Sequence, residues 1–126
     1  MARVLLVEDN VTFQQTLKNL LSGRFPFMHF DVAKDGEEAF QKINDFRPNL
    51  IFMDVKLPGE NGLEITKKTK DSKFDGLIII LTSHDLPEYR EAAKSCGADY
   101  FISKGSSTAE EILTLVDSIL LKHFHP

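Results

Sequence analysis

The sequence contains a single cysteine, which excludes an internal disulfide framework and is typical of a reducing compartment. No apolar run approaches the roughly 20 residues that cross a bilayer, and the run in MARVLLVED is too short for a signal peptide. Positive charge is not in excess, since the net charge is −4. This charge argues against a protein that coats nucleic acid or anionic membrane. We therefore expect a soluble cytoplasmic domain that binds neither membranes nor nucleic acid directly.

Internal repeats, low-complexity segments and interdomain linkers are also absent from the 126 residues. An apolar content of 42% and a charged content of 27% are ordinary for a globular protein. A chain of this length fits one domain and buries roughly two-thirds of its unfolded surface. The expected unit is a single domain over residues 1–126.

Short apolar runs divide the chain at regular intervals. Four of them are nearly continuous: VLLV at 4–7, LIFM at 50–53, LIIIL at 77–81 and YFI at 100–102. Continuous runs are typical of strands that are buried on both faces of a parallel sheet. A fifth run, MHFDVA at 28–33, alternates in character and predicts an edge strand with one wetter face.

Helical patterns lie between these runs. The first two and the last have firm apolar stripes, which comprise Phe13, Leu17, Leu20 and Leu21, then Ala39, Phe40, Ile43 and Phe46, and finally Ile112, Leu115, Val116, Ile119 and Leu120. The segments from Gly62 to about Asp71 and from Glu88 to Cys96 have thinner stripes. Strand and helix therefore alternate five times. This alternation predicts an α/β fold, a doubly wound parallel sheet with right-handed crossovers and helices on both faces.

Residues that typically begin helices mark the expected starts of two helices. Asp85 and Pro87 indicate the start of the fourth helix. Two overlapping capping boxes, Ser107 to Glu110 and Thr108 to Glu111, precede the last helix.

Charged and hydroxyl side chains stand where the predicted strands end. Glu8 and Asp9 follow the first strand, Asp54 the third, Thr82 the fourth and Lys104 the fifth. In such sheets function collects outside the carboxyl ends of the strands, so these side chains are expected to converge. One or two of them could simply be helix caps, but an arrangement of all five at successive strand ends argues for a site.

The charges restrict what this site can be. Two carboxylates about 4 Å apart repel by about 4 kcal/mol at an effective dielectric near 20, and Lys104 alone cannot neutralise three of them. A hard divalent cation can, and Mg²⁺ takes one or two carboxylates while it binds phosphate oxygens. A carboxylate beside such a metal is also a plausible nucleophile for phosphoryl transfer.

The sequence resembles the receiver domain of two-component response regulators over essentially its whole length. The resemblance lies in VEDN at 7–10, MDVKLPGENG at 53–62, ILTS at 80–83 and GADYFISK at 97–104. It implies a flavodoxin-like fold of the chemotaxis-regulator type, with five helices and a five-stranded sheet in the order 2-1-3-4-5. It also implies that Asp54 is the phosphoacceptor.

The same resemblance implies the remaining roles. Asp9 would ligate Mg²⁺ directly, Glu8 mostly through water, and the backbone carbonyl of Lys56 would complete the protein ligands. Lys104 would pair with the phosphoryl group, and Thr82 would hydrogen-bond it once it is attached. Phe101 falls at the aromatic switch position of the family.

Two residues depart from the family pattern. Gly105 follows Lys104 where proline is usual, and without proline a cis bond costs about 2.5–4 kcal/mol, so we expect a trans bond. Phe101 replaces the usual tyrosine and cannot form a hydroxyl hydrogen bond. The neighbouring Tyr100 should lie on the opposite face of the strand.

Other functional classes fit less well. Phosphatases that work through an aspartyl-phosphate need a second aspartate two positions after the nucleophile, where this chain has Lys56. A flavodoxin needs a phosphate loop after the first strand, where Glu8 and Asp9 would repel a phosphate. No GxxxxGK[ST] loop exists for a nucleotide hydrolase.

The resemblance also implies partners. The phosphoryl donor would be a sensor histidine kinase or a histidine phosphotransfer protein, and the domain would catalyse only its own phosphorylation and dephosphorylation. Dimerisation would use the face of the fourth helix, fifth strand and fifth helix. The chain is expected to be a single-domain regulator or the receiver part of a DNA-binding transcriptional regulator.

Overall fold

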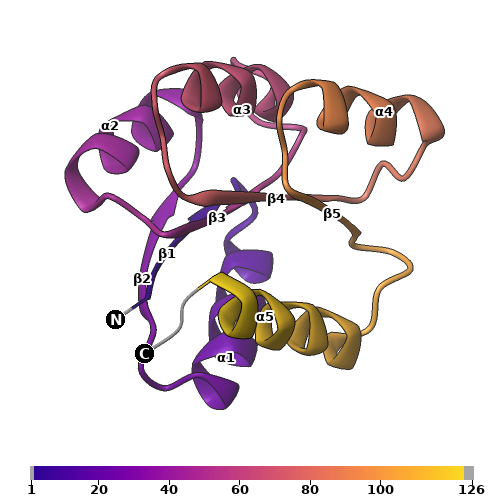
Figure 1. The fold of residues 1–126 in the computed structure, drawn as a ribbon. Coiled ribbons are helices and arrows are strands. Elements are labelled where there is room, and N and C mark those ends of the chain that lie inside the picture. Colours follow the sequence, from indigo (N-terminus) through magenta and orange to yellow (C-terminus); the bar gives the residue numbers. More distant parts are fainter. Residues whose placement is uncertain (1, 124–126) are drawn as a thin grey trace.

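The computed structural model describes residues 2–123, which form alternating strands and helices (Figure 1). The elements are β1 (Arg3–Val7), α1 (Val11–Arg24), β2 (His29–Ala33), α2 (Gly36–Phe46), β3 (Leu50–Met53), α3 (Gly62–Asp71), β4 (Leu77–Thr82), α4 (Pro87–Ser95), β5 (Tyr100–Ser103) and α5 (Ala109–His123). Over residues 2–123, none of the helices has the length and apolar character that a membrane crossing needs.

All strand pairs are parallel, and the sheet has the order β2-β1-β3-β4-β5. The helices α1 and α5 cover one face, and α2, α3 and α4 cover the other (Figure 1). Within the described residues the predicted doubly wound, flavodoxin-like fold is therefore confirmed, with its five strands and five helices.

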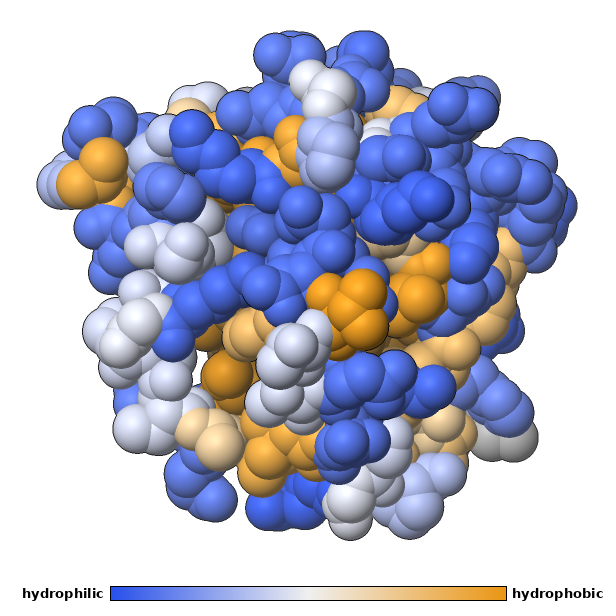
Figure 2. All heavy atoms as spheres, turned by 180° about the vertical axis from the view of Figure 1, so that it is seen from behind, coloured by the Kyte–Doolittle hydropathy of each residue, from blue (hydrophilic) through white to orange (hydrophobic). Residues whose placement is uncertain are grey.

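The core has two halves because successive strand residues point to opposite faces. In β1, Val4 and Leu6 pack towards α1 and α5, whereas Leu5 and Val7 pack towards α2, α3 and α4. All residues of β3 are buried, as its continuous apolar pattern predicts for a central strand. At the edge, β2 exposes His29. Seen from behind, hydrophilic side chains cover most of the surface and leave small hydrophobic groups between them (Figure 2).

The last helix uses one of its two possible capping boxes. The Thr108 hydroxyl accepts from the Glu111 N–H at 3.1 Å, and the Glu111 carboxylate accepts from the Thr108 N–H at 3.0 Å. The helix then begins at Ala109, so the predicted box from Ser107 is not the one that forms.

The fourth helix begins at Pro87, as the sequence predicts, but Asp85 does not cap it. Leu86 occupies the N-cap without a side-chain hydrogen bond, and Pro87 is the first helical residue. Asp85 instead pairs with the Arg90 guanidinium through contacts of 2.6 and 3.0 Å. A bidentate arginine pair outcompetes the cap because it satisfies both carboxylate oxygens at once.

The attachment of α4 to the sheet is thin. The helix buries Ala93 and half-buries Tyr89 and Ala92, while the rest of its surface faces solvent. Little apolar area therefore holds α4 in place, which makes it the helix most able to shift.

Strand β5 presents its two aromatic residues to opposite faces. Tyr100 packs on the core half that contains α1 and α5, and Phe101 packs on the other half. The peptide bond between Lys104 and Gly105 is trans, as are the others within residues 2–123. The predicted trans bond and the predicted opposition of Tyr100 and Phe101 are thus confirmed.

Gly62 holds the loop after β3 in its tight course. A Cβ atom at Gly62 would lie 1.8 Å from the carbonyl oxygen of Asp54 and 3.1 Å from the Cα of Val55. The Gly62 N–H also donates to the Val55 carbonyl at 2.9 Å. The backbone around Asp54 therefore requires a residue without a side chain at position 62.

We expect Gly62→Ala to lower the free energy of unfolding by about 2 kcal/mol or more, because the backbone of Asp54 must move to admit the methyl group. Urea denaturation measures the loss. The matched control is Gly23→Ala in α1, where nothing lies within 4 Å of the added methyl, and there we expect a gain of about 0.5–1 kcal/mol. Equal stability of Gly62→Ala and wild type would contradict the close approach.

Candidate functional site

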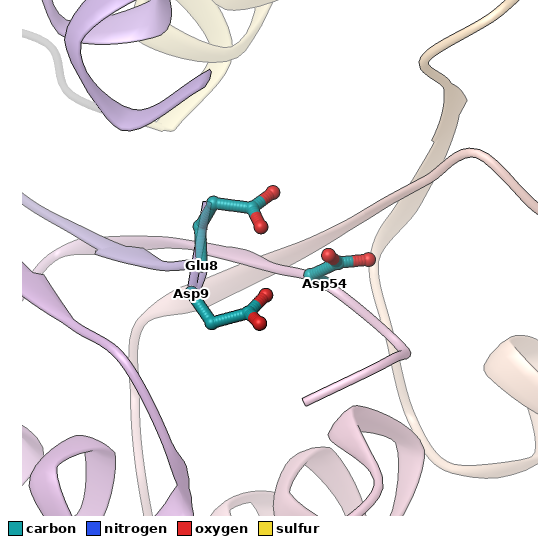
Figure 3. A group of neighbouring side chains, drawn as sticks. All are labelled: Glu8, Asp9 and Asp54. Atoms are coloured by element: carbon teal, nitrogen blue, oxygen red, sulfur yellow. The ribbon is translucent and has the colours of Figure 1, made fainter. Parts of the chain in front are cut away.

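The carboxyl ends of β1 and β3 bring three acidic side chains together. The Asp54 N–H donates to the Val7 carbonyl at 3.0 Å and so extends the pairing of β3 with β1 by one residue. On the other side, the Glu8 N–H donates to the Ala33 carbonyl of β2 at 2.9 Å. These backbone bonds align the carboxylates of Glu8, Asp9 and Asp54 at the same edge of the sheet (Figure 3).

The three carboxylates are close enough to share a cation. One oxygen atom from each of Glu8, Asp9 and Asp54 lies within 4.8 Å of the others. Glu8 and Asp54 are only 5% and 7% exposed, whereas Asp9 faces solvent. Buried carboxylates at such distances repel one another strongly unless positive charge lies nearby.

Lys104, directly after the edge strand β5, supplies positive charge to these carboxylates. Its ammonium donates to Glu8 and, at 3.2 Å, to Oδ2 of Asp54. The backbone N–H of Lys104 donates to the Thr82 carbonyl at 2.8 Å, which extends the ladder between β4 and β5. One ammonium against three carboxylates leaves the site with a negative balance.

This balance affects the protonation of Glu8. Burial, the largest cause, raises the pKa of Glu8 above its ordinary 4.5, and the nearby Asp54 charge raises it further, although hydrogen bonds from Lys104 and the Asn10 N–H act to lower it. A divalent cation would offset the repulsion among the carboxylates, and carboxylate oxygens are the ligands that Mg²⁺ prefers. The donor set therefore fits a hard divalent cation.

The other predicted residues lie at the end of β4, in the loop after Asp54 and in β5. Thr82 ends β4 and is fully buried, and its hydroxyl accepts from the His84 N–H at 3.1 Å. Lys56 is exposed in the loop after Asp54. Phe101 is half-buried in β5, two strands away from β3.

The Phe101 ring has a cationic neighbour from α4. The Arg90 guanidinium lies over the ring, 4.6 Å from its centroid, while it also pairs with Asp85 in the loop after β4. Arg90 therefore joins the loop, the fourth helix and the fifth strand. Sequence reasoning missed this contact, although Arg90 follows Asp85 by only five positions.

Two residues of α1 also belong to the site. The side-chain amide of Gln14 donates to the backbone carbonyl of Glu8, and Gln14 is itself buried. The ring of Phe13 lies 4.2 Å from the Lys104 ammonium. Phe13 was recognised in the sequence as part of an apolar helix face, and its place three residues after the Asn10 cap is the signal that could have linked it to the strand end.

Known proteins with this arrangement share a family. The model of the response regulator receiver domain matches residues 4–117. The response regulator MprA of Mycolicibacterium vanbaalenii is 31% identical over 118 residues, which cover 94% of this chain and 50% of that protein. The chain thus spans about half the length of this curated relative.

Solved structures with the same fold cover nearly the whole chain. The two-component response regulator of the LuxR family from Aurantimonas sp. SI85-9A1 is 28% identical, with a TM-score of 0.87 over 97% of this chain and 86% of that chain. The response regulator protein TrrA of Thermotoga maritima, solved in complex with Mg²⁺-BeF, is 32% identical, with a TM-score of 0.82 over 95% of this chain and 100% of that one. Both the sequence match and the fold show that the chain belongs to the receiver domains of two-component response regulators.

Proposed function

We propose that Asp54 is the phosphoacceptor of this receiver domain and that Glu8, Asp9 and Lys104 prepare it for phosphoryl transfer. The observation that carries the proposal is the environment of Asp54, whose carboxylate is buried but lies 3.2 Å from an ammonium and beside two further carboxylates. Such a cluster destabilises the fold unless it binds something, so its position supports a reactive role.

The transfer is a substitution at phosphorus. A carboxylate oxygen of Asp54 forms a bond to the phosphorus atom while the bond from phosphorus to the donor breaks, and its electron pair leaves with the donor. The donor is a phosphohistidine or a small acyl phosphate, and the product is an acyl phosphate on Asp54. Lys104 already donates to Asp54, so its ammonium can follow the negative charge onto a phosphoryl oxygen.

Glu8, Asp9, Asp54 and the backbone carbonyl of Lys56 are the groups that would hold Mg²⁺, with Glu8 acting mostly through water. This set supplies more negative charge than Lys104 balances, which is what a divalent cation needs. When bound, the cation offsets negative charge on the transferring group.

The signal would leave through Thr82 and Phe101. A phosphoryl group on Asp54 offers new acceptor oxygens, and the Thr82 hydroxyl, which accepts from the His84 N–H, can turn to donate its own hydrogen to one of them. That movement draws the loop after β4 inward and changes the position of Asp85, which holds Arg90 over the Phe101 ring. Phe101 can then rotate towards the space that the loop leaves.

The partners follow from this chemistry. Receiver domains are in general phosphorylated by histidine kinases, and for this chain we propose a sensor histidine kinase or a histidine phosphotransfer protein in the cytoplasm. The face of α4, β5 and α5 would change on phosphorylation and would bind the next partner or a second copy. The chain spans half of its relative MprA, and we propose that it is the receiver part of a DNA-binding transcriptional regulator or, alternatively, a single-domain regulator.

With acetyl phosphate and Mg²⁺, we expect a base-labile phosphoryl adduct on the wild type and none on Asp54→Asn, because the substitution removes the attacking oxygen. Mass spectrometry of the intact chain measures the adduct. Asp45→Asn, which removes an exposed carboxylate from α2, is the matched control and should react as the wild type does. An adduct of equal yield in EDTA would defeat the metal part of the proposal.

In EDTA, the stability of the wild type relative to Glu8→Gln should fall as the pH rises. Because the pKa of Glu8 is raised in the folded state, its contribution to stability is fully present below pH 4.5 and is lost as the pH rises through the raised pKa. Urea denaturation from about pH 4 to 7 measures the difference, and the exposed Glu64→Gln serves as control. A difference that grows with pH would mean that the Lys104 pair outweighs burial.

Arg90→Met should favour the switched state, because it removes the guanidinium that holds Phe101 and ties α4 to Asp85. We expect about two- to fivefold tighter binding of the phosphate mimic beryllofluoride, together with faster amide exchange across residues 83–104. Arg24→Met, which breaks the exposed pair with Asp117, is the matched control. Unchanged affinity and exchange in Arg90→Met would exclude this restraint.

A further inference from the structure

Lys104 has a third neighbour besides the two carboxylates. The centroid of the Phe13 ring lies 4.2 Å from the Lys104 ammonium. The lysine contacts with Phe40 and Phe74 elsewhere in the described chain are both longer, at 5.9 Å. An ammonium at 4.2 Å is within the range at which the negative face of an aromatic ring attracts a cation.

The helix cap and the core packing fix the position of the Phe13 ring. Asn10 caps α1 and accepts from the Phe13 N–H at 2.9 Å, so the backbone of Phe13 is tied to the end of β1. The ring is half-buried and packs on the core between the sheet and the α1 and α5 helices. The cap and the packing together leave the ring little freedom to move away from Lys104.

Side chains pack closely on the α1 side of the site. The void lined by Phe13, Glu8, Asp54 and their core neighbours has a volume of only about 10 Å³, about the space of one water. An ammonium carries three N–H donors, of which one faces Glu8 and another faces Asp54. On the side of α1, the Phe13 ring is the neighbour of the ammonium.

We infer that Phe13 is a positioning residue for Lys104 during phosphoryl transfer to Asp54, an inference that rests on the proposed function. A third carboxylate at this place would bind the ammonium too tightly to let it follow the charge from Asp54 to a phosphoryl oxygen. An aliphatic side chain would exclude water but give no attraction. The ring face attracts the cation only weakly, so it holds Lys104 at the strand ends while the hydrogen-bond partner of the ammonium changes.

The test compares initial rates of phosphorylation by acetyl phosphate and Mg²⁺ for the full chain. Phe13→Leu keeps an apolar side chain and removes the ring, and we expect its rate to fall about three- to tenfold. Phe13→Tyr and Phe13→Trp keep a ring face and should stay within about twofold of the wild type. Phe40→Leu removes the ring of a distant lysine contact and is the matched control, with an unchanged rate.

A purely structural role predicts a different pattern. If Phe13 acts through Lys104, the Phe13→Leu loss should disappear when both proteins also carry Lys104→Met, and an equal loss in both backgrounds would overturn the inference. Should the Lys104→Met proteins react too slowly to compare, proton NMR decides: the ε-methylene signals of Lys104 should lie upfield in the wild type through the ring current and move downfield in Phe13→Leu. Signals that stay in place would equally overturn it.

The outcomes separate the two proposals. Wild type without any adduct would refute Asp54 as phosphoacceptor, and the role of Phe13 with it. A wild type that reacts at Asp54 while Phe13→Leu reacts equally fast would refute the role of Phe13 alone. Loss of rate in Phe13→Leu with recovery in Phe13→Trp supports both.

Discussion

The excess of negative charge at the carboxyl edge of the sheet is the constraint on which the rest of the site depends. Glu8, Asp9 and Asp54 present oxygens within 4.8 Å of one another, and Lys104 balances one of the three charges. Burial of the Glu8 carboxylate is the largest cause of its raised pKa, and the charge of Asp54 adds to it. A fold keeps such a cluster only if the surrounding structure outweighs its repulsion, and here the buried strands and the backbone ladder do so. The cluster thus stays available for the cation and the phosphoryl group that we propose.

The two parts of the molecule that respond to this charge differ in rigidity. The acidic residues follow central strands whose residues are buried on both faces, so their geometry is held firmly. In contrast, α4 buries little more than Ala93, and the exposed Arg90 joins it to Asp85 and to the half-buried Phe101. A firm site beside a loosely held helix allows a small local change to become a larger surface change. The proposed signal follows this gradient of rigidity.

Most of the fold and the membership of the acidic cluster were predictable from the sequence. Continuous apolar runs indicate strands, and parallel topology then brings Glu8, Asp54 and Lys104 to one edge although they are distant in sequence. The contacts that depend on side-chain reach were not predictable. The ring of Phe13 has the same helical period as a core residue, and Asp85 has the same composition signal as a helix cap, so only packing reveals that they contact Lys104 and Arg90.

Thermal unfolding with and without Mg²⁺ tests the charge constraint most directly, because it needs no phosphoryl donor. If repulsion among the carboxylates shapes the site, Mg²⁺ should stabilise the wild type, by about 2.7 kcal/mol at a hundred times its dissociation constant. Asp9→Asn should be more stable than the wild type without Mg²⁺ and should gain little when it is added, while the exposed Asp45→Asn should behave as the wild type. An Asp9→Asn protein that is no more stable without the cation, and gains as much as the wild type with it, would contradict the account.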